Sequence, residues 1–105
     1  MIHQQTREAH RLDEALVRVE EAVKEGQWSA AWDLLAGIIV DWESTRRRWA
    51  LHVDHGEMDV ITDDLKEAQA LVTVRDPAAL APLRRARDRI VTLPERDRLN
   101  LENLF

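Results

Sequence analysis

The strongest constraint on the fold is the spacing of apolar residues from Trp28 to Val53. Large side chains recur there at alternating steps of four and three residues, the period that places them on one side of an α-helix. The positions are Trp28, Trp32, Leu35, Ile39, Trp42, Arg46, Trp49 and Val53. They include all 4 tryptophans of the chain. Because each tryptophan buries about 150–250 Å², the pattern predicts a core-facing helix rather than a cofactor site.

Arg46 is the one charged residue in this series. Its aliphatic stem can lie along the apolar face while the guanidinium reaches solvent, which is the interpretation we favour. The alternative is an ion pair with an acidic residue of a neighbouring helix. Ala31, Leu34 and Ile38 lie beside the series and widen the apolar face to the breadth that a bundle helix needs.

The segment 4–25 shows the same helical period. Its apolar positions are Ala9, Leu12, Leu16, Val19 and Val23, and the residues between them are mostly charged or polar. Gly26 follows directly, and glycine supplies the backbone freedom that helices commonly use just past their last turn. The sequence therefore predicts a first helix that stops at Gly26 and a second that starts within a residue or two of Gln27.

A break in the second helix is predicted at residues 54–57. Asp54 followed by Glu57 has the spacing of an N-cap with its capping partner, and Gly56 weakens a helix interior. The apolar series also changes phase here. The new positions are Met58, Ile61, Leu65, Ala68 and Val72. A kinked but continuous helix is the alternative.

The clearest helix start lies at Asp76 and Pro77. Aspartate is a good N-cap, and proline suits the first helical position, where its missing N–H is not needed. The apolar positions that follow are Ala79, Leu83, Ala86, Ile90 and Leu93. Pro94 is expected to end this helix or to start a short last one, and Leu101 and Leu104 indicate that the tail packs back onto the bundle.

Length and composition are those of one helical domain. The chain has 105 residues, 45% of them hydrophobic, with only 3 glycines and 3 prolines, so one core and few turns are expected. We predict an all-α fold over residues 1–105: an antiparallel four-helix bundle with a short C-terminal helical extension. The absence of cysteine excludes disulfides, and no apolar run approaches the roughly 18 residues of a membrane span.

The charge pattern argues against nucleic acid as a partner. The formal net charge is −5, whereas nucleic-acid-binding domains are usually clearly basic. The densest basic run lies in the last predicted helix, where we interpret it as a solvated face; a phosphate site is the alternative. Its members are Arg84, Arg85, Arg87 and Arg89.

Ligand-type side chains converge at one place, the cluster of His52, His55, Glu57 and Asp59. On a continuous helix His55 and Asp59 would share a face, with His52 one turn earlier, so these three are the metal-ligand candidates. Bundle metal sites usually use Glu-x-x-His on two helices, and that motif does not occur here. We therefore favour a structural or capping role, and expect no metal, no cofactor and no catalytic residue, since no glycine-rich phosphate loop or nucleophile elbow occurs either.

Two resemblances add to this interpretation. The stretch Gly26-x-Trp28-x-x-Ala31 resembles the turn between the two helices of a tetratricopeptide repeat, which implies a helical hairpin. Over about residues 12–105 the chain resembles a bacterial family of short helical proteins, domain of unknown function 4363. That resemblance rests on the same Gly-x-Trp segment, on Trp42 and Trp49, on His55-x-Glu57-Met58-Asp59, and on the closing Leu-Glu-Asn-Leu-Phe.

The family resemblance implies a helical domain without a known activity. Members typically begin with a hydrophobic anchor segment, which this chain lacks at its start, so it is expected either to follow such an anchor outside the membrane or to be a soluble member. We expect a non-enzymatic interaction or structural module that can associate with itself; the alternative is a metal- or small-ligand-binding bundle that uses residues 52–59. Structural or partner-facing roles are expected for Trp28, Trp42, Trp49, His55, Glu57 and Asp59.

Overall fold

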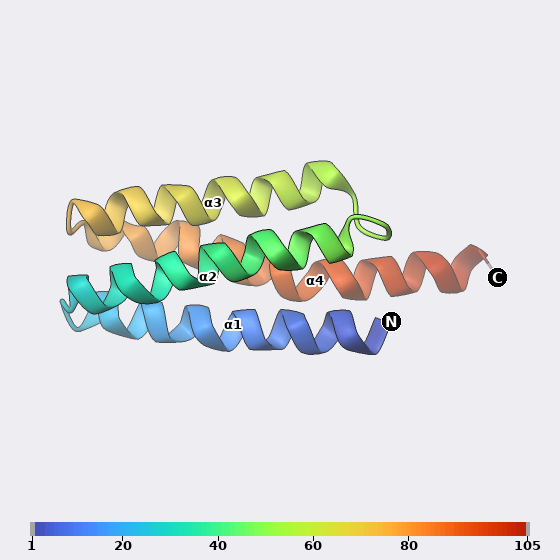
Figure 1. Cartoon of the computed structure of the whole chain (residues 1–105), viewed down its shortest axis with the longest axis horizontal. Helices are drawn as coiled ribbons and strands as arrows, with labels where there is room; N and C mark the ends of the chain where they lie inside the picture. The colour runs from blue at the N-terminus through green and yellow to red at the C-terminus, as the bar shows by residue number, and fades with distance from the viewer. Residues whose placement is uncertain (1, 105) are drawn as a thin grey trace.

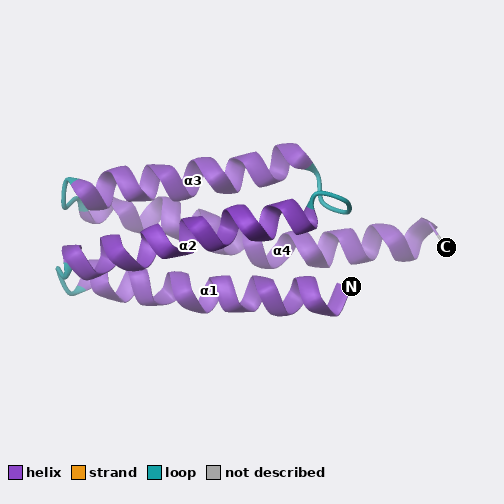
Figure 2. Ribbon diagram, viewed as in Figure 1, coloured by secondary structure: helices purple, strands orange, loops and turns teal. Residues whose placement is uncertain are grey.

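The structure, a computed structural model, describes the backbone of residues 2–104 and the side chains of residues 4–96 and Leu99. Within that range the chain forms helices and turns, without strands (Figure 2). The helices are α1 (Ile2–Lys24), α2 (Trp28–Trp49), α3 (His55–Thr73), the short 3-10 helix η1 (Pro77–Ala79) and α4 (Leu80–Leu104).

The long helices form the predicted antiparallel bundle (Figure 1). α1 packs against α2 and α4, and α3 packs against the same two helices from the other side. The bundle measures 49 × 21 × 20 Å. One end holds the α1–α2 and α3–α4 turns and is called the turn end. At the opposite end, the open end, the last part of α4 extends beyond the start of α1 (Figure 1).

The core is built from the apolar series of the sequence. All five apolar positions predicted for the first helix are buried, as are the five of α3 and the five that begin at Ala79. Trp42 and Trp49 are fully buried and meet edge to face, with ring centroids 5.6 Å apart and an interplanar angle of 85°. Such an aromatic pair contributes about 0.5–1.5 kcal/mol beyond its buried area.

The first half of α2 departs from the prediction of a wholly buried tryptophan series. Trp32 is 42% exposed and Leu34 is 40% exposed, while Trp28 is only half-buried. Ala31, Leu35 and Ile38 supply the core contacts there instead. The apolar surface of this half is broader than the area that α1 and α3 cover, so the tryptophans at its margin stay accessible.

The predicted break between α2 and α3 is confirmed, and the continuous helix is wrong. Asp54 is the N-cap of α3, and its carboxylate accepts a hydrogen bond from the Glu57 backbone N–H at 3.0 Å. The second helix ends at Trp49. Val53 is nevertheless buried, because the loop turns back and the Val53 N–H bonds the Trp49 carbonyl at 2.9 Å.

α1 and α3 end in the same way at the turn end. In each, the first residue past the cap has positive φ, and the next N–H bonds a carbonyl five residues back: Gln27 to Ala22 at 2.8 Å and Asp76 to Leu71 at 2.9 Å. In α1 the residue with positive φ is Gly26, at 71°. In α3 it is Arg75, at 57°, a conformation that non-glycine residues rarely adopt.

Pro94 does not end a helix, and the separate C-terminal helix is absent, because α4 continues through it to Leu104. A proline inside a helix removes one backbone hydrogen bond. Here Pro94 and Leu93 are both buried, and the next turn is tied to α3 by an Arg96–Glu57 ion pair of 3.2 Å. These contacts offset the lost bond. The side chains of Leu101 and Leu104, predicted to pack back, lie outside the described residues.

Candidate functional site

Arginine–carboxylate pairs join every two neighbouring helices of the bundle. α1 meets α2 through Arg11–Asp41 at 3.0 Å and through Glu8–Arg48. The α1–α4 pairs are Arg87–Asp13 at 2.9 Å and Arg87–Glu20 at 2.7 Å. The α2–α3 pair is Arg46–Asp59 at 2.8 Å, and the α3–α4 pairs include Arg85–Asp64 at 3.2 Å and Arg85–Glu67 at 2.5 Å.

This network changes the interpretation of the arginine run in α4. Arg85 and Arg89 pair with carboxylates of α3, and Arg87 pairs with two carboxylates of α1, so these three arginines are not simply solvated. The hydrogen bond from Arg87 to Asp13 is the largest cause of a raised pKa of its guanidinium, with a further contribution from Glu20. Of the four, Arg84 alone is exposed and forms no ion pair with another described residue. Because three of the four arginines already pair with carboxylates, the arrangement does not support the alternative that the run binds a phosphate group.

Arg46 likewise forms the ion pair that the sequence left as the second choice. Its Nη1 donates to Thr62 Oγ1 at 2.9 Å and its Nη2 to Asp59 Oδ1 at 2.8 Å. The stem lies in the apolar series as predicted, but the guanidinium ends on α3 rather than in solvent. Thr62 also accepts a hydrogen bond from Trp42 Nε1 at 2.9 Å, so one hydroxyl links the core tryptophan to the ion pair.

The residues of the His52–Asp59 cluster separate in the structure. Asp59 pairs with Arg46 of α2, Glu57 with Arg96 of α4, and His55 is exposed in the first turn of α3. His52 lies in the preceding loop and faces a pocket that the other cluster members do not line. Among the described side chains, no group of three or more His, Asp or Glu residues could hold a metal ion. The cluster thus contributes to the start of α3 and forms three ion pairs, since Glu57 also lies 4.0 Å from Arg89 of α4.

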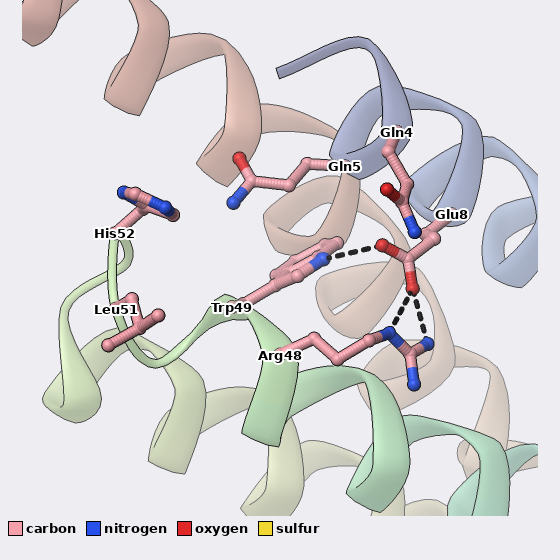
Figure 3. A pocket seen from close by; sticks show the side chains of 7 residues that line it. All are labelled: Gln4, Gln5, Glu8, Arg48, Trp49, Leu51 and His52. Atoms are coloured by element: carbon pink, nitrogen blue, oxygen red, sulfur yellow. Dashed lines mark hydrogen bonds and ion pairs between the residues drawn. The ribbon is translucent and has the colours of Figure 1, made fainter. Parts of the chain in front are cut away.

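The pocket that His52 faces lies at the open end and measures about 190 Å³ (Figure 3). We call it the open-end pocket; its lining residues are Gln4, Gln5, Glu8, Arg48, Trp49, Leu51 and His52. The Glu8 carboxylate is buried, and Arg48 donates to its Oε2 from Nε at 2.9 Å and from Nη2. Trp49 Nε1 donates to the other carboxylate oxygen at 3.4 Å. One carboxylate therefore connects α1 to the last turn of α2.

Gln5 differs from the hydrogen-bonded polar residues of this pocket. It is only 6% exposed, yet its Oε1 has no hydrogen-bond partner among the described residues. An unpaired buried polar atom costs about 1–3 kcal/mol. Sequence reasoning missed Gln5, Glu8 and Arg48, because each lies on the polar flank of its helix and only the packing of α1 on α2 brings them together.

A second accessible feature lies at the turn end, and we call it the turn-end surface: Trp28, Trp32 and Arg75. Two hollows of about 280 and 410 Å³ share Trp28, Ser29 and Arg75. Trp32 Nε1 donates to Thr73 Oγ1 at 3.2 Å, which fixes the indole against α3. Arg75 has no ion-pair partner among the described residues. Sequence reasoning also missed Arg75. The available signal was its position between the last apolar residue of α3 and the N-cap Asp76, where a helix end is expected.

These features define an all-helical bundle whose neighbouring helices are joined by arginine–carboxylate pairs. The chain belongs to the family described as domain of unknown function DUF4363, whose sequence profile matches residues 1–104. The match reaches further toward the start than the resemblance over residues 12–105 indicated. No curated protein and no solved structure gives a match. Within the described residues, every helix is too short or too polar to cross a membrane.

Proposed function

We propose that the protein is a non-enzymatic helical interaction module that binds a protein partner through the turn-end surface. The observation that carries this proposal is the 42% exposure of Trp32 in a helix whose later tryptophans are fully buried. Tryptophan is enriched among the residues that contribute most to protein–protein binding. An accessible indole that lines one hollow with the half-buried Trp28 and the exposed Arg75 has the composition of an interface anchor.

Trp32 is also held in one orientation. Its hydrogen bond to Thr73 joins α2 to the end of α3, so the ring needs little ordering when a partner binds. Each side chain that must be immobilised on binding costs about 0.5–1.5 kcal/mol. A fixed indole therefore favours binding over an equally exposed but mobile one.

Arg75 supports the same surface through its backbone. It occupies a left-handed position that glycine takes at the equivalent end of α1, and such a conformation costs a non-glycine residue about 1–2 kcal/mol. A strained residue retained at an accessible place suggests that its side chain has a use. Arginine, like tryptophan, is enriched among the residues that contribute most to protein–protein binding.

The non-enzymatic part of the proposal rests on how the titratable groups are used. The buried carboxylates of Glu8, Glu20 and Asp64 each pair with an arginine of another helix, so joining helices is a sufficient role for them. The pairing of the α4 arginines likewise supports a partner other than nucleic acid, because counterion release needs free basic groups.

Site-specific photo-crosslinking in the cells that make the protein tests the proposal. Trp32→p-benzoylphenylalanine should give a discrete crosslinked species, and adding Arg75→Gly should weaken it at least several-fold. Val40→p-benzoylphenylalanine is the matched control, since Val40 is a 72% exposed apolar residue of the same helix away from the turn end. Crosslinks equal at both positions, or none at position 32, would contradict the proposal.

Self-association is part of the same proposal, with a second copy as the partner. Size-exclusion chromatography with light scattering at rising protein concentration measures it directly. We expect a concentration-dependent increase in mass that Trp32→Ser abolishes. A constant monomer mass at high concentration would restrict the proposal to a different protein.

A further inference from the structure

The hollow that Trp28 and Trp32 line also holds one charge of each sign. Asp33 lines it from α2, and Arg75 lines it from the turn that follows α3. Both side chains are exposed, and neither forms an ion pair with another described residue. The hydrogen bond from Trp32 to Thr73 joins the two sides at 3.2 Å. The hollow is therefore an aromatic patch with an unpaired acid on its α2 side and an unpaired base on its α3 side.

The other charged groups of the turn end leave this pattern intact. Lys24 and Glu25, at the end of α1, line neither of the two hollows. The Asp76 carboxylate caps η1, where its Oδ1 accepts the Ala78 N–H at 2.8 Å. Residues 20–35 and 70–85 are described in full, and the last part of α4 lies at the opposite end of the bundle (Figure 1). A partner in the hollow therefore meets one negative and one positive side chain.

A surface with this charge pattern is complementary to a copy of itself. In a two-fold dimer both subunits contribute the same patch, so two different residues of the patch can meet twice, once on each side of the axis. With the axis through the hollow, Asp33 of each copy faces the partner's Arg75. A partner of one charge sign would attract one of these side chains and repel the other. Charge complementarity therefore favours a second copy over a uniformly acidic or basic partner.

The size of the bundle end limits the strength of such a dimer. The cross-section of the bundle is 21 × 20 Å, about 420 Å², whereas stable interfaces bury about 800 Å² on each partner. The two charge pairs would also be solvent-exposed, and exposed ion pairs contribute little each. We therefore expect weak, reversible association that high protein concentration populates.

We infer that the partner of the turn-end surface is a second copy of this chain, bound as a two-fold dimer with two reciprocal Asp33–Arg75 ion pairs. Trp28 and Trp32 of the two copies pack between these pairs. The inference rests on the proposed function, because it uses the same surface, and it adds the identity of the partner and the pairing that selects it.

Charge reversal tests the pairing, with sedimentation velocity at up to about 1 mM protein as the measurement. Asp33→Arg opposes two arginines at both pairs and Arg75→Asp opposes two carboxylates, so each should raise the dimer Kd about tenfold or more. Aspartate enters the left-handed conformation of position 75 more readily than most residues, so that variant is expected to fold. An equimolar mixture of the two variants should dimerise again, because each then supplies the charge that the other needs.

Asp63→Arg and Arg47→Asp are the matched controls, since both residues are exposed and form no ion pair with another described residue. They change the net charge of −5 by the same +2 and −2 as the two test variants, and should dimerise like the wild type. The inference is overturned if the wild type sediments as a monomer throughout, if test and control variants behave alike, or if the mixture stays monomeric.

The crosslink at position 32 separates this outcome from failure of the proposed function. A crosslinked species with the mass of two chains supports both. A species that contains a different protein, together with a monomeric wild type, overturns the dimer and keeps the proposed function.

Discussion

The two halves of α2 have the same tryptophan spacing but different surroundings. Trp42 and Trp49 are fully buried and in contact with each other, whereas Trp28 and Trp32 stand at the margin of the core. Indole hydrogen bonds occur in both halves, since Trp32 donates to Thr73 just as Trp42 donates to Thr62. The halves differ in which residues fill the core: Ala31, Leu35 and Ile38 do so in the first half, and the two tryptophans do so in the second. Spacing thus determines which side of the helix faces inward, and the neighbouring helices determine how deeply each position is buried.

The largest expected effect comes from truncating one tryptophan in each half. Trp42→Ala should lower the free energy of unfolding by about 3–5 kcal/mol, because it leaves a large cavity and removes the hydrogen bond to Thr62. Trp32→Ala should cost about 1 kcal/mol or less, since much of that ring is already in water. Urea denaturation followed by circular dichroism measures both. Equal losses would show that the two halves do not differ energetically.

The Glu8–Arg48 ion pair is the next test of how strongly the second half of α2 is held to its neighbour α1. Arg48→Met leaves a buried carboxylate with only the Trp49 N–H, and should destabilise the protein by about 1–3 kcal/mol, a range reduced because Arg48 is 46% exposed. Glu8→Leu combined with Arg48→Met should recover part of that loss. A double-mutant cycle in denaturant measures the coupling. Strictly additive single losses would mean that the pair contributes nothing.

The N-cap of α3 separates the two helices at the open end. Asp54→Ala removes the acceptor for the Glu57 N–H and should cost about 1 kcal/mol. Asp54→Asn should cost much less, because asparagine caps nearly as well. Thermal unfolding monitored by circular dichroism distinguishes the variants. An Asp54→Ala variant as stable as the wild type would indicate that packing alone holds the break.

The smallest effects are expected at the two equivalent helix ends of the turn end. Arg75→Gly should stabilise the fold by about 0.5 kcal/mol, the relief of the left-handed strain less the added freedom of the unfolded chain. Gly26→Ala should destabilise it by about 1 kcal/mol, because alanine is strained at φ 71°. Denaturation curves of the two variants give the change in the free energy of unfolding for each. Changes of opposite sign support the equivalence of the two ends, whereas a destabilising Arg75→Gly would contradict it.

Much of the fold followed from local signals. The apolar periods placed the core of each helix, and Asp54 and Asp76 marked two starts that the structure shows with their caps formed. Pro94 misled because its cost depends on packing: the proline is buried and the next turn is tied to α3, and neither fact is visible in the local sequence. Exposure of Trp32 depends in the same way on the breadth of neighbouring helices.

The candidate sites were harder to predict. The His52–Asp59 cluster looked like one group because its members are close in sequence, but arginines from α2 and α4 divide it. Gln5, Glu8 and His52 are separated by up to 47 residues (52 minus 5), and only the packing of α1 against α2 brings them to one pocket. Pairwise proximity of polar residues across helices is not encoded in either helix alone.

The double pairing of Arg87 has a consequence for how the bundle assembles. Its guanidinium bonds Asp13 and Glu20, which are seven residues apart on α1 and so about 10 Å apart along the helix axis. Sliding α4 along α1 by one turn in either direction would separate the guanidinium from one of these carboxylates. Apolar stripes tolerate such a slip, because one leucine replaces another every turn. A single arginine that spans two turns therefore gives this otherwise repetitive helix pair one preferred alignment.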